Sequence, residues 1–101
     1  MATFISLVSF TEQGIRDFRA SPERADKFKS VAEDAGVKLK EVYWTMGAYD
    51  IVLIFEASDE QAVVAAMIGI GSLGNVRTQT LRAFDSSEMK EIISKVPKAK
   101  R

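Results

Sequence analysis

The sequence predicts one α+β domain in which helices cover one face of an antiparallel sheet. Four segments rich in β-branched and aromatic residues are interspersed with segments whose apolar residues recur at spacings of three and four. The 101-residue chain is long enough for one hydrophobic core and too short for two. With 47% hydrophobic and 28% charged residues, its composition is that of an ordinary globular domain.

The first strand is predicted over residues 3–10, where TFISLVSF is β-branched and aromatic and contains no strand breaker. Residues 11–14 are expected to turn the chain away from this strand. A helix is predicted over residues 22–35, because its apolar residues line one face, Ser21 stands at the N-cap position and Gly36 follows as a C-terminal stop.

A hairpin is predicted next, formed by strands over residues 37–45 and 49–57 around a Met-Gly turn at 46–47. A second helix is expected after Ser58 and Gln61, whose spacing of three is typical of a capping box. Its inner face is predicted to comprise Ala62, Val63, Ala66, Met67 and Ile70. Three glycines are expected to end it: Gly69, Gly71 and Gly74.

The remaining elements are a fourth strand over residues 75–84 and a short helix opened by Asp85 and Glu88. We place a single domain at residues 1–96 and a basic tail at residues 97–101. The order is β-α-β-β-α-β plus a terminal helix, which is that of the ferredoxin-like fold. The first and third strands are central in this fold, in agreement with their being the most apolar.

Charge and composition exclude several classes of function. The chain has 14 Lys and Arg and 14 Asp and Glu, so it has no net field for nucleic acid or an anionic membrane, and neither is expected as a partner. Cysteine and histidine are absent, so no metal and no cofactor are expected. No apolar run is long enough to cross a bilayer, and residues 1–10 do not resemble a secretory signal, so a cytoplasmic location is expected.

The third strand is too apolar for a sheet with water on its second face. Five consecutive apolar residues occupy it: Ile51, Val52, Leu53, Ile54 and Phe55. A half-exposed strand alternates apolar and polar residues, so this strand places large apolar groups on both faces. We predict that a second copy of the chain covers the outer face and that these residues form a homodimer interface. The alternatives are a locally overpacked strand and a loop folded beneath the sheet.

Residues 47–50, Gly-Ala-Tyr-Asp, resemble the G-x-Y-D signature of the GYD domain family. The resemblance continues in SPERA at residues 21–25 and GNVRTQTLRAF at residues 74–84, and it extends from about Phe4 to Ile93. It implies a dimeric α/β barrel, in which the sheets of two ferredoxin-like subunits pack face to face. The family carries no established activity, and its structural relatives include cofactor-free oxygenases, isomerase-like enzymes and ligand-binding domains.

Two roles are open for the residues of this motif. Gly47 is expected to adopt a positive φ in the turn, and Asp50 to accept a backbone N–H near the start of the third strand. Alternatively, Tyr49 and Asp50 offer a phenol and a carboxylate to a ligand between sheet and helix, as an acid and base pair. Neighbouring side chains on a strand point to opposite faces, which argues against both touching one ligand within one subunit.

Trp44 and Arg77 complete the candidate ligand-binding residues. One of Tyr43 and Trp44 is expected in a core and the other at an interface or pocket mouth, and the core position is assigned to Trp44. Arg77 is expected to hold a carboxylate or phosphate, or to form a salt bridge. Residues 69–74 match G-x-G-x-x-G, but they close a helix instead of opening one, so they are interpreted as a helix end.

Three functions remain open from the sequence. The first is a small homodimer that binds an apolar or weakly polar small molecule between sheet and helices. The second is a cofactor-independent dimeric α/β-barrel enzyme, oxygenase-like or isomerase-like, with Tyr49, Asp50 or Arg77 around the substrate. The third is a purely structural module that associates with another protein.

Overall fold

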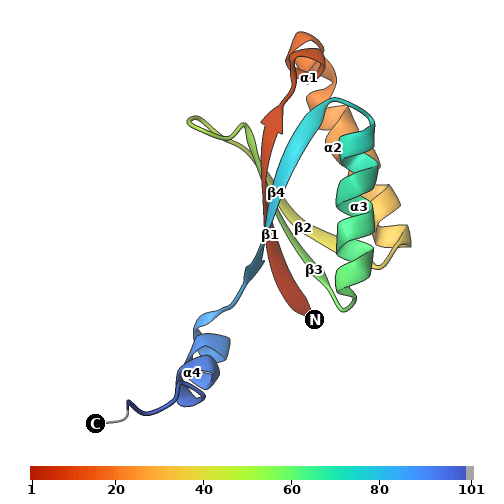
Figure 1. Ribbon diagram of the computed structural model, residues 1–101. Coiled ribbons are helices and arrows are strands. Elements are labelled where there is room, and N and C mark those ends of the chain that lie inside the picture. The colour runs from red at the N-terminus through yellow and green to blue at the C-terminus, as the bar shows by residue number, and fades with distance from the viewer. Residues whose placement is uncertain (100–101) are drawn as a thin grey trace.

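The computed structural model describes residues 1–99 and shows a two-layer α+β domain (Figure 1). The antiparallel sheet has the strand order β2-β3-β1-β4, and α2 and α3 cover one of its faces. The strands are β1 (Ala2–Phe10), β2 (Val37–Trp44), β3 (Ile51–Ala57) and β4 (Val76–Ala83). The helices are α1 (Glu12–Arg16), the 3-10 helix η1 (Phe18–Ala20), α2 (Ser21–Asp34), α3 (Glu60–Ser72) and α4 (Ser86–Ser94). The predicted ferredoxin-like fold with a terminal helix is therefore confirmed.

β1 and β3 form the centre of the sheet, as predicted. Phe4 of β1 lies opposite Phe55 of β3, and their rings stack with centroids 5.6 Å apart. Side chains alternate along both strands, so every second residue enters the core between sheet and helices. The buried apolar core comprises Phe4, Val8, Ala32, Val37, Leu39, Ile51, Leu53, Phe55, Ala57, Val63, Met67 and Val76.

The segment after β1 is helical, where the sequence predicted only a turn. Thr11 is the N-cap of α1, and its Oγ1 accepts a hydrogen bond from Gly14 N at 3.1 Å. η1 then leads directly into α2, so Ser21 already has helical φ and ψ. The prediction of Ser21 as N-cap is wrong for this reason, and Ala20 takes that position. Gly36 follows α2 with φ +85°, as expected of a helix stop.

α3 begins at a different cap from the one predicted. Its N-cap is Asp59 instead of Ser58, because the Asp59 carboxylate accepts a hydrogen bond from Gln61 N at 2.9 Å. The predicted inner face of the helix is confirmed by the buried or core-packed Ala62, Val63, Ala66, Met67 and Ile70.

Gly69 and Gly71 were expected to end α3 but lie inside it. The helix continues to Ser72, and neither glycine has a positive φ. Gly74 follows with φ +84°, a value that favours glycine, and turns the chain into β4. A glycine inside a helix is less favourable than alanine by roughly 0.5–1 kcal/mol, so the two helical glycines need a reason other than helix formation.

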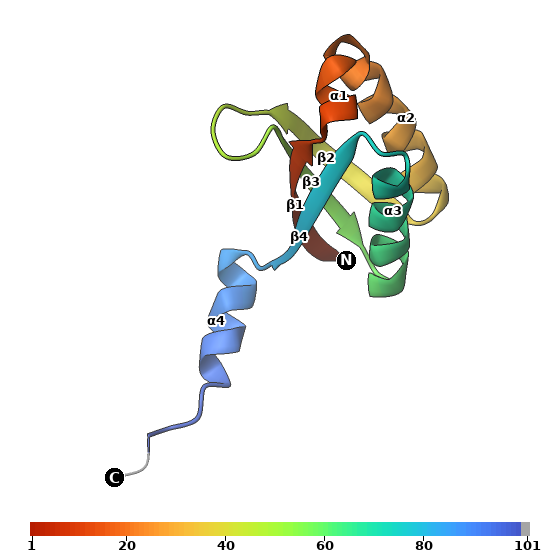
Figure 2. The same cartoon turned by 45° about the horizontal axis from the view of Figure 1, so that its top comes forward.

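α4 projects away from the body of the domain (Figures 1 and 2). The predicted capping box opens it: Asp85 Oδ1 accepts from Glu88 N at 2.8 Å, and Glu88 Oε1 accepts from Asp85 N at 3.1 Å. None of the α4 residues is buried. The described chain is consequently elongated, with extents of 58 × 31 × 20 Å. Of the predicted basic tail, Lys100 and Arg101 lie outside the described residues.

Candidate functional site

A cavity of about 490 Å³ lies between α2 and α3, on the covered side of the sheet. Its floor is made by core residues of the sheet, namely Val8, Ile51, Leu53 and Val76. The helices and their C-caps contribute small residues, namely Ala25, Ala32, Ala35, Ala65, Ala66 and Gly69, and larger ones, including Phe28, Val31 and Ile70. Its volume is in the usual range for small-molecule sites, about 300–1,000 Å³.

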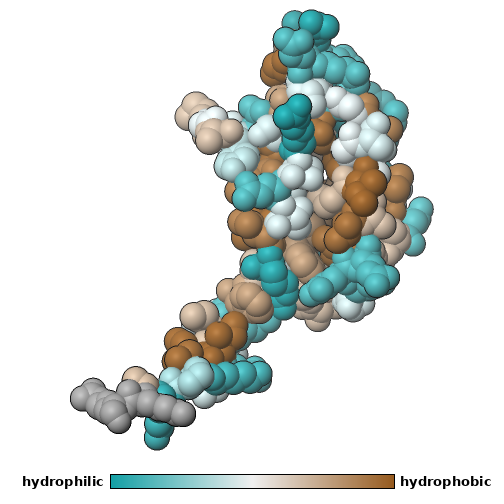
Figure 3. All heavy atoms as spheres, viewed as in Figure 1, coloured by the Kyte–Doolittle hydropathy of each residue, from teal (hydrophilic) through white to brown (hydrophobic). Residues whose placement is uncertain are grey.

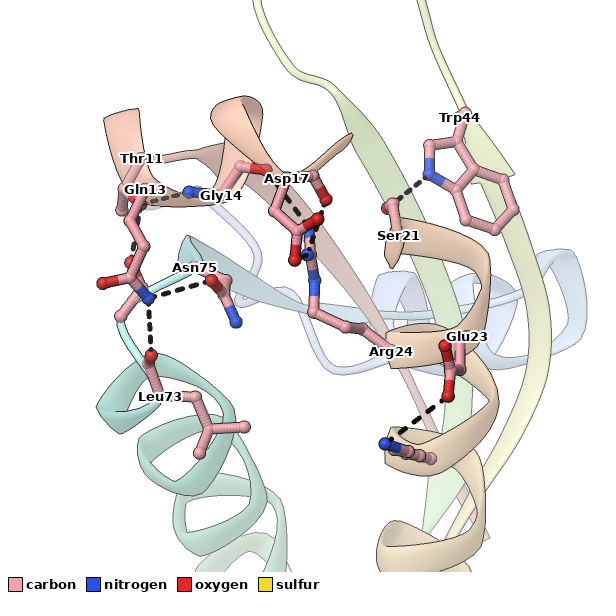
Figure 4. A network of polar contacts seen from close by, with 12 residues as sticks. Thr11, Gln13, Gly14, Asp17, Ser21, Glu23, Arg24, Trp44, Leu73 and Asn75 are labelled. Atoms are coloured by element: carbon pink, nitrogen blue, oxygen red, sulfur yellow. Dashed lines mark hydrogen bonds and ion pairs between the residues drawn. The ribbon is translucent and has the colours of Figure 1, made fainter. Parts of the chain in front are cut away.

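Polar groups beside the cavity are bonded to other parts of the protein (Figure 4). Ser21 Oγ accepts a hydrogen bond from Trp44 Nε1 at 2.9 Å. The Arg24 guanidinium donates to the backbone oxygens of Asp17 and Gly14, at 2.9 and 3.3 Å. These groups therefore have partners without a ligand, and the remaining surface offered to one is mainly apolar.

α1 is linked to the loop before β4, where Leu73 and Asn75 line the cavity. Gln13 Nε2 donates to Leu73 O at 3.0 Å and to Asn75 Oδ1 at 2.9 Å (Figure 4). Gly14 fits closely against this loop, because a Cβ at its position would lie 1.9 Å from Asn75 O. Residues 11–14, predicted as a simple turn, thus hold the loop at one end of the cavity.

The G-x-Y-D segment forms the β2–β3 hairpin, and none of its residues lines the cavity. Gly47 has φ +122°, the positive value predicted. Asp50 joins the hairpin to β1: its Oδ2 accepts from Phe10 N at 2.8 Å, and its backbone N donates to Val8 O at 2.8 Å. Asp50 therefore has the backbone-acceptor geometry expected of a structural residue.

Tyr49 and Arg77 lie toward the sheet face opposite the helices. Tyr49 Oη donates to Gln79 Oε1 at 2.9 Å, and Gln79 and Arg77 share this face because they are two residues apart on β4. Trp44 lies on the helix side through its bond to Ser21, but 46% of its surface is exposed, so its expected burial in a core is wrong. The candidate ligand-binding residues consequently do not converge on one pocket.

The five apolar residues of β3 divide between the two sheet faces. Ile51, Leu53 and Phe55 are buried toward the helices, and the first two line the cavity. Val52 and Ile54 are half-buried on the opposite face, which we term the open face. The apolar centre of the open face comprises Ile5, Leu7, Val52, Ile54 and Leu81. Of the predicted interface residues, Val52 and Ile54 are the ones that a partner can contact.

Neither a membrane-spanning helix nor a cluster of metal ligands occurs within residues 1–99. No helix in this part of the chain combines the length and apolar character needed to cross a bilayer. Nor do three or more His, Cys, Asp or Glu side chains of these residues gather where they could hold a metal ion.

Comparisons with known proteins identify the family. The chain is 36% identical over 90 residues to the glutamine synthetase and cystathionine beta-lyase binding protein of Thermus thermophilus, a match that covers 88% of this chain and 95% of that protein. Its fold is similar to the crystal structure of TTHA0845, also from Thermus thermophilus, with a TM-score of 0.55 and 26% identity, over 85% of this chain and 96% of that one. The family model described as GYD domain matches residues 4–93. The chain, whose G-x-Y-D segment predicted this result, belongs to the GYD domain family.

Proposed function

We propose that this protein binds a small apolar or weakly polar molecule in the cavity between α2 and α3. The observation that carries the proposal is a space of about 490 Å³ with a mainly apolar lining, beside polar groups that are bonded within the protein. Apolar walls that face water are stabilised when a molecule of matching shape removes them from water. Gly69 lies at the exposed edge of this space, where a Cβ meets no heavy atom within 4 Å.

The lining of the cavity favours binding over chemistry. Its charged residues are Arg24, bonded to backbone oxygens, and Lys27, whose Nζ lies 3.6 Å from Glu23 Oε1. Among the described residues that line it, none carries a carboxylate or a phenol. Tyr49 and Asp50, the pair considered for acid–base catalysis, belong to the hairpin outside it. We therefore favour a binding protein over a cofactor-independent enzyme.

Native mass spectrometry of the protein purified from its own host tests the proposal. We expect a mass above that of the chain alone. Extraction with an organic solvent should release an apolar compound and lower the mass to that of the chain. The Gly69→Leu variant should lose the added mass. Gly71→Leu should keep it, because Gly71 lies in the same helix but does not line the cavity. Equal ligand retention by the two variants would refute the proposal.

Binding to an enzyme is a second candidate function. The observation that favours it is the 36% identity to a protein named for binding glutamine synthetase and cystathionine beta-lyase. We propose that this chain binds the glutamine synthetase or the cystathionine beta-lyase of its own host. Surface plasmon resonance with the two purified enzymes at micromolar concentration measures this directly, and the absence of a response to both would exclude it.

We further propose that two copies of the chain pair through the open face. Ile5 lies between Ile54 and Leu81 in the sheet, and Leu7 lies beside Val52. This apolar patch receives no cover from α2 or α3, which lie on the other side. Light scattering should give twice the 11.2 kDa mass of the chain, and Ile54→Lys should give the single chain. A parent protein that remains at 11.2 kDa at micromolar concentration would contradict the dimer.

A further inference from the structure

Arg82, near the end of β4, contacts the first turn of α4. Arg82 Nη2 lies 3.6 Å from Glu88 Oε2 in the first turn of α4, and Arg82 Nη1 donates to Thr3 O at 3.2 Å. The guanidinium carbon also lies 4.3 Å from the centroid of the Phe84 ring. Only Phe84 and Asp85 separate β4 from α4, so these contacts tie the helix to the end of the sheet.

α4 presents an apolar stripe that the described chain leaves uncovered. Met89 and Ile93 of α4, and Val96 two residues beyond its end, recur at spacings of four and three, and 48%, 58% and 64% of their surfaces are exposed. Figure 3 shows apolar atoms gathered over this helix. A short helix that packs against nothing is marginally stable in water, so a partner that covers the stripe would account for the helix.

α4 stands on the same side of the sheet as the open face. In Figures 1 and 2, α4 and the β2–β3 hairpin both extend on the side away from α2 and α3. The two projections lie toward opposite ends of the sheet. A partner that sits on the open face therefore comes to lie between them and beside α4.

The projected area of the open face leaves room for a further contact in a dimer. Four strands about 4.8 Å apart and about eight residues long give a projected area of roughly 500 Å². A standard interface buries about 800 Å² on each partner. A nine-residue helix about 10 Å wide covers roughly 140 Å². If each subunit packs its own α4 on the partner and is covered by the partner's α4, the two helices add about 280 Å² to the contact area of each subunit. The sheet face and the two helices together reach the area of a stable dimer.

We infer that α4 is an exchanged arm: in the open-face dimer, the apolar stripe of each α4 packs on the second copy. The inference rests on the proposed open-face dimer and goes beyond it, because pairing of the sheets does not by itself engage α4. A second copy fits as the occupant since two-fold symmetry lets each chain give one arm and receive one. The formal net charge of the chain is zero, so two copies carry no overall charge repulsion.

Light scattering over a dilution series tests the arm with two double variants. Met89→Gln with Ile93→Gln removes the stripe and retains good helix formers, whereas Ser87→Gln with Ser94→Gln alters the other side of α4. We expect the stripe variant to raise the Kd of the dimer at least about a hundredfold, because four apolar side chains per dimer are lost. The control should keep the parent Kd. A stripe variant with the parent Kd overturns the inference.

Thiol labelling of an Ile93→Cys variant separates the arm from the dimer. The natural chain has no cysteine, so the introduced thiol is the only one. Labelling should be slow in the dimer and fast once Ile54→Lys is added. Fast labelling in an intact dimer overturns the arm and leaves the open-face dimer standing, whereas a monomeric parent chain overturns both. Protection that appears only with added glutamine synthetase or cystathionine beta-lyase also overturns the arm and assigns α4 to the enzyme.

Discussion

Replacing Gly69 by leucine should block the ligand cavity and stabilise the protein. Gly69 lies inside α3 and lines the cavity, and a Cβ at its position meets no heavy atom within 4 Å. Its φ is not positive, so a side chain introduces no backbone strain. We therefore expect a leucine side chain to occupy volume that the proposed ligand would need.

Two contributions determine the expected gain in the free energy of unfolding. Exchange of glycine for leucine inside a helix stabilises by about 0.8 kcal/mol through helix propensity. Gly69 is exposed at the edge of the cavity, so a leucine side chain that folds into the cavity gains part of the roughly 1.5–3 kcal/mol that full burial provides. Gly71 lies in the same helix but does not line the cavity. Gly71→Leu should therefore gain the helix-propensity contribution and little of the burial contribution.

Urea unfolding of the ligand-free proteins measures these differences, and native mass spectrometry measures the ligand. We expect Gly69→Leu to be more stable than Gly71→Leu, and Gly71→Leu to be more stable than the parent chain. Ligand should disappear only from Gly69→Leu. If Gly69→Leu is no more stable than Gly71→Leu, the leucine does not enter the cavity, and the reasoning about this space is wrong.

Three further substitutions test contacts of the loop and the hairpin. Gly14→Ala should destabilise by roughly 1–3 kcal/mol or more, because its Cβ would lie 1.9 Å from Asn75 O; a parent-like melting temperature would contradict this. Asp50→Ala should lower the free energy of unfolding in urea by about 1–3 kcal/mol, because Phe10 N loses its acceptor. An Asp50→Ala protein that keeps its stability but loses ligand would support the site role. Gly47→Val should cost about 1–3 kcal/mol at φ +122°, and calorimetry that finds no loss would exclude strain there.

The sheet and the inner helix faces were predictable because burial of one face requires apolar residues at regular spacings. These spacings are two residues in a strand and three or four in a helix, and both are visible in the sequence. Phe4 and Phe55 belong to the two most apolar strands, and they meet at the centre of the sheet. Helix starts were less predictable, because neighbouring polar side chains compete to cap one helix. Asp59 takes the role expected of Ser58, and η1 places Ser21 within α2. Such outcomes depend on φ and ψ values that the local sequence does not determine.

The cavity could not be located from the sequence alone. Its walls contain alanines and glycines such as Ala25, Ala66 and Gly69, and these residue types also occur in helices that line no cavity. The spacing of the glycines around Gly69 predicts a helix end instead of a cavity wall. The available signal was that both helices carry small residues near their inner faces. The distance between α2 and α3 depends on how each helix packs on the sheet. The spacing of apolar residues along the sequence does not predict that distance.

The family motif and the cavity lie in different parts of the domain, and this separation bears on function. Asp50 ties the hairpin to β1 through Phe10 N, so the motif maintains the sheet. The cavity depends instead on small side chains such as Ala66 and Gly69, which the motif does not specify. Exchange of these residues would therefore alter the proposed ligand site while the fold persisted. Membership of the GYD family therefore predicts the scaffold, whereas the proposed ligand site depends on the helix residues that face the cavity.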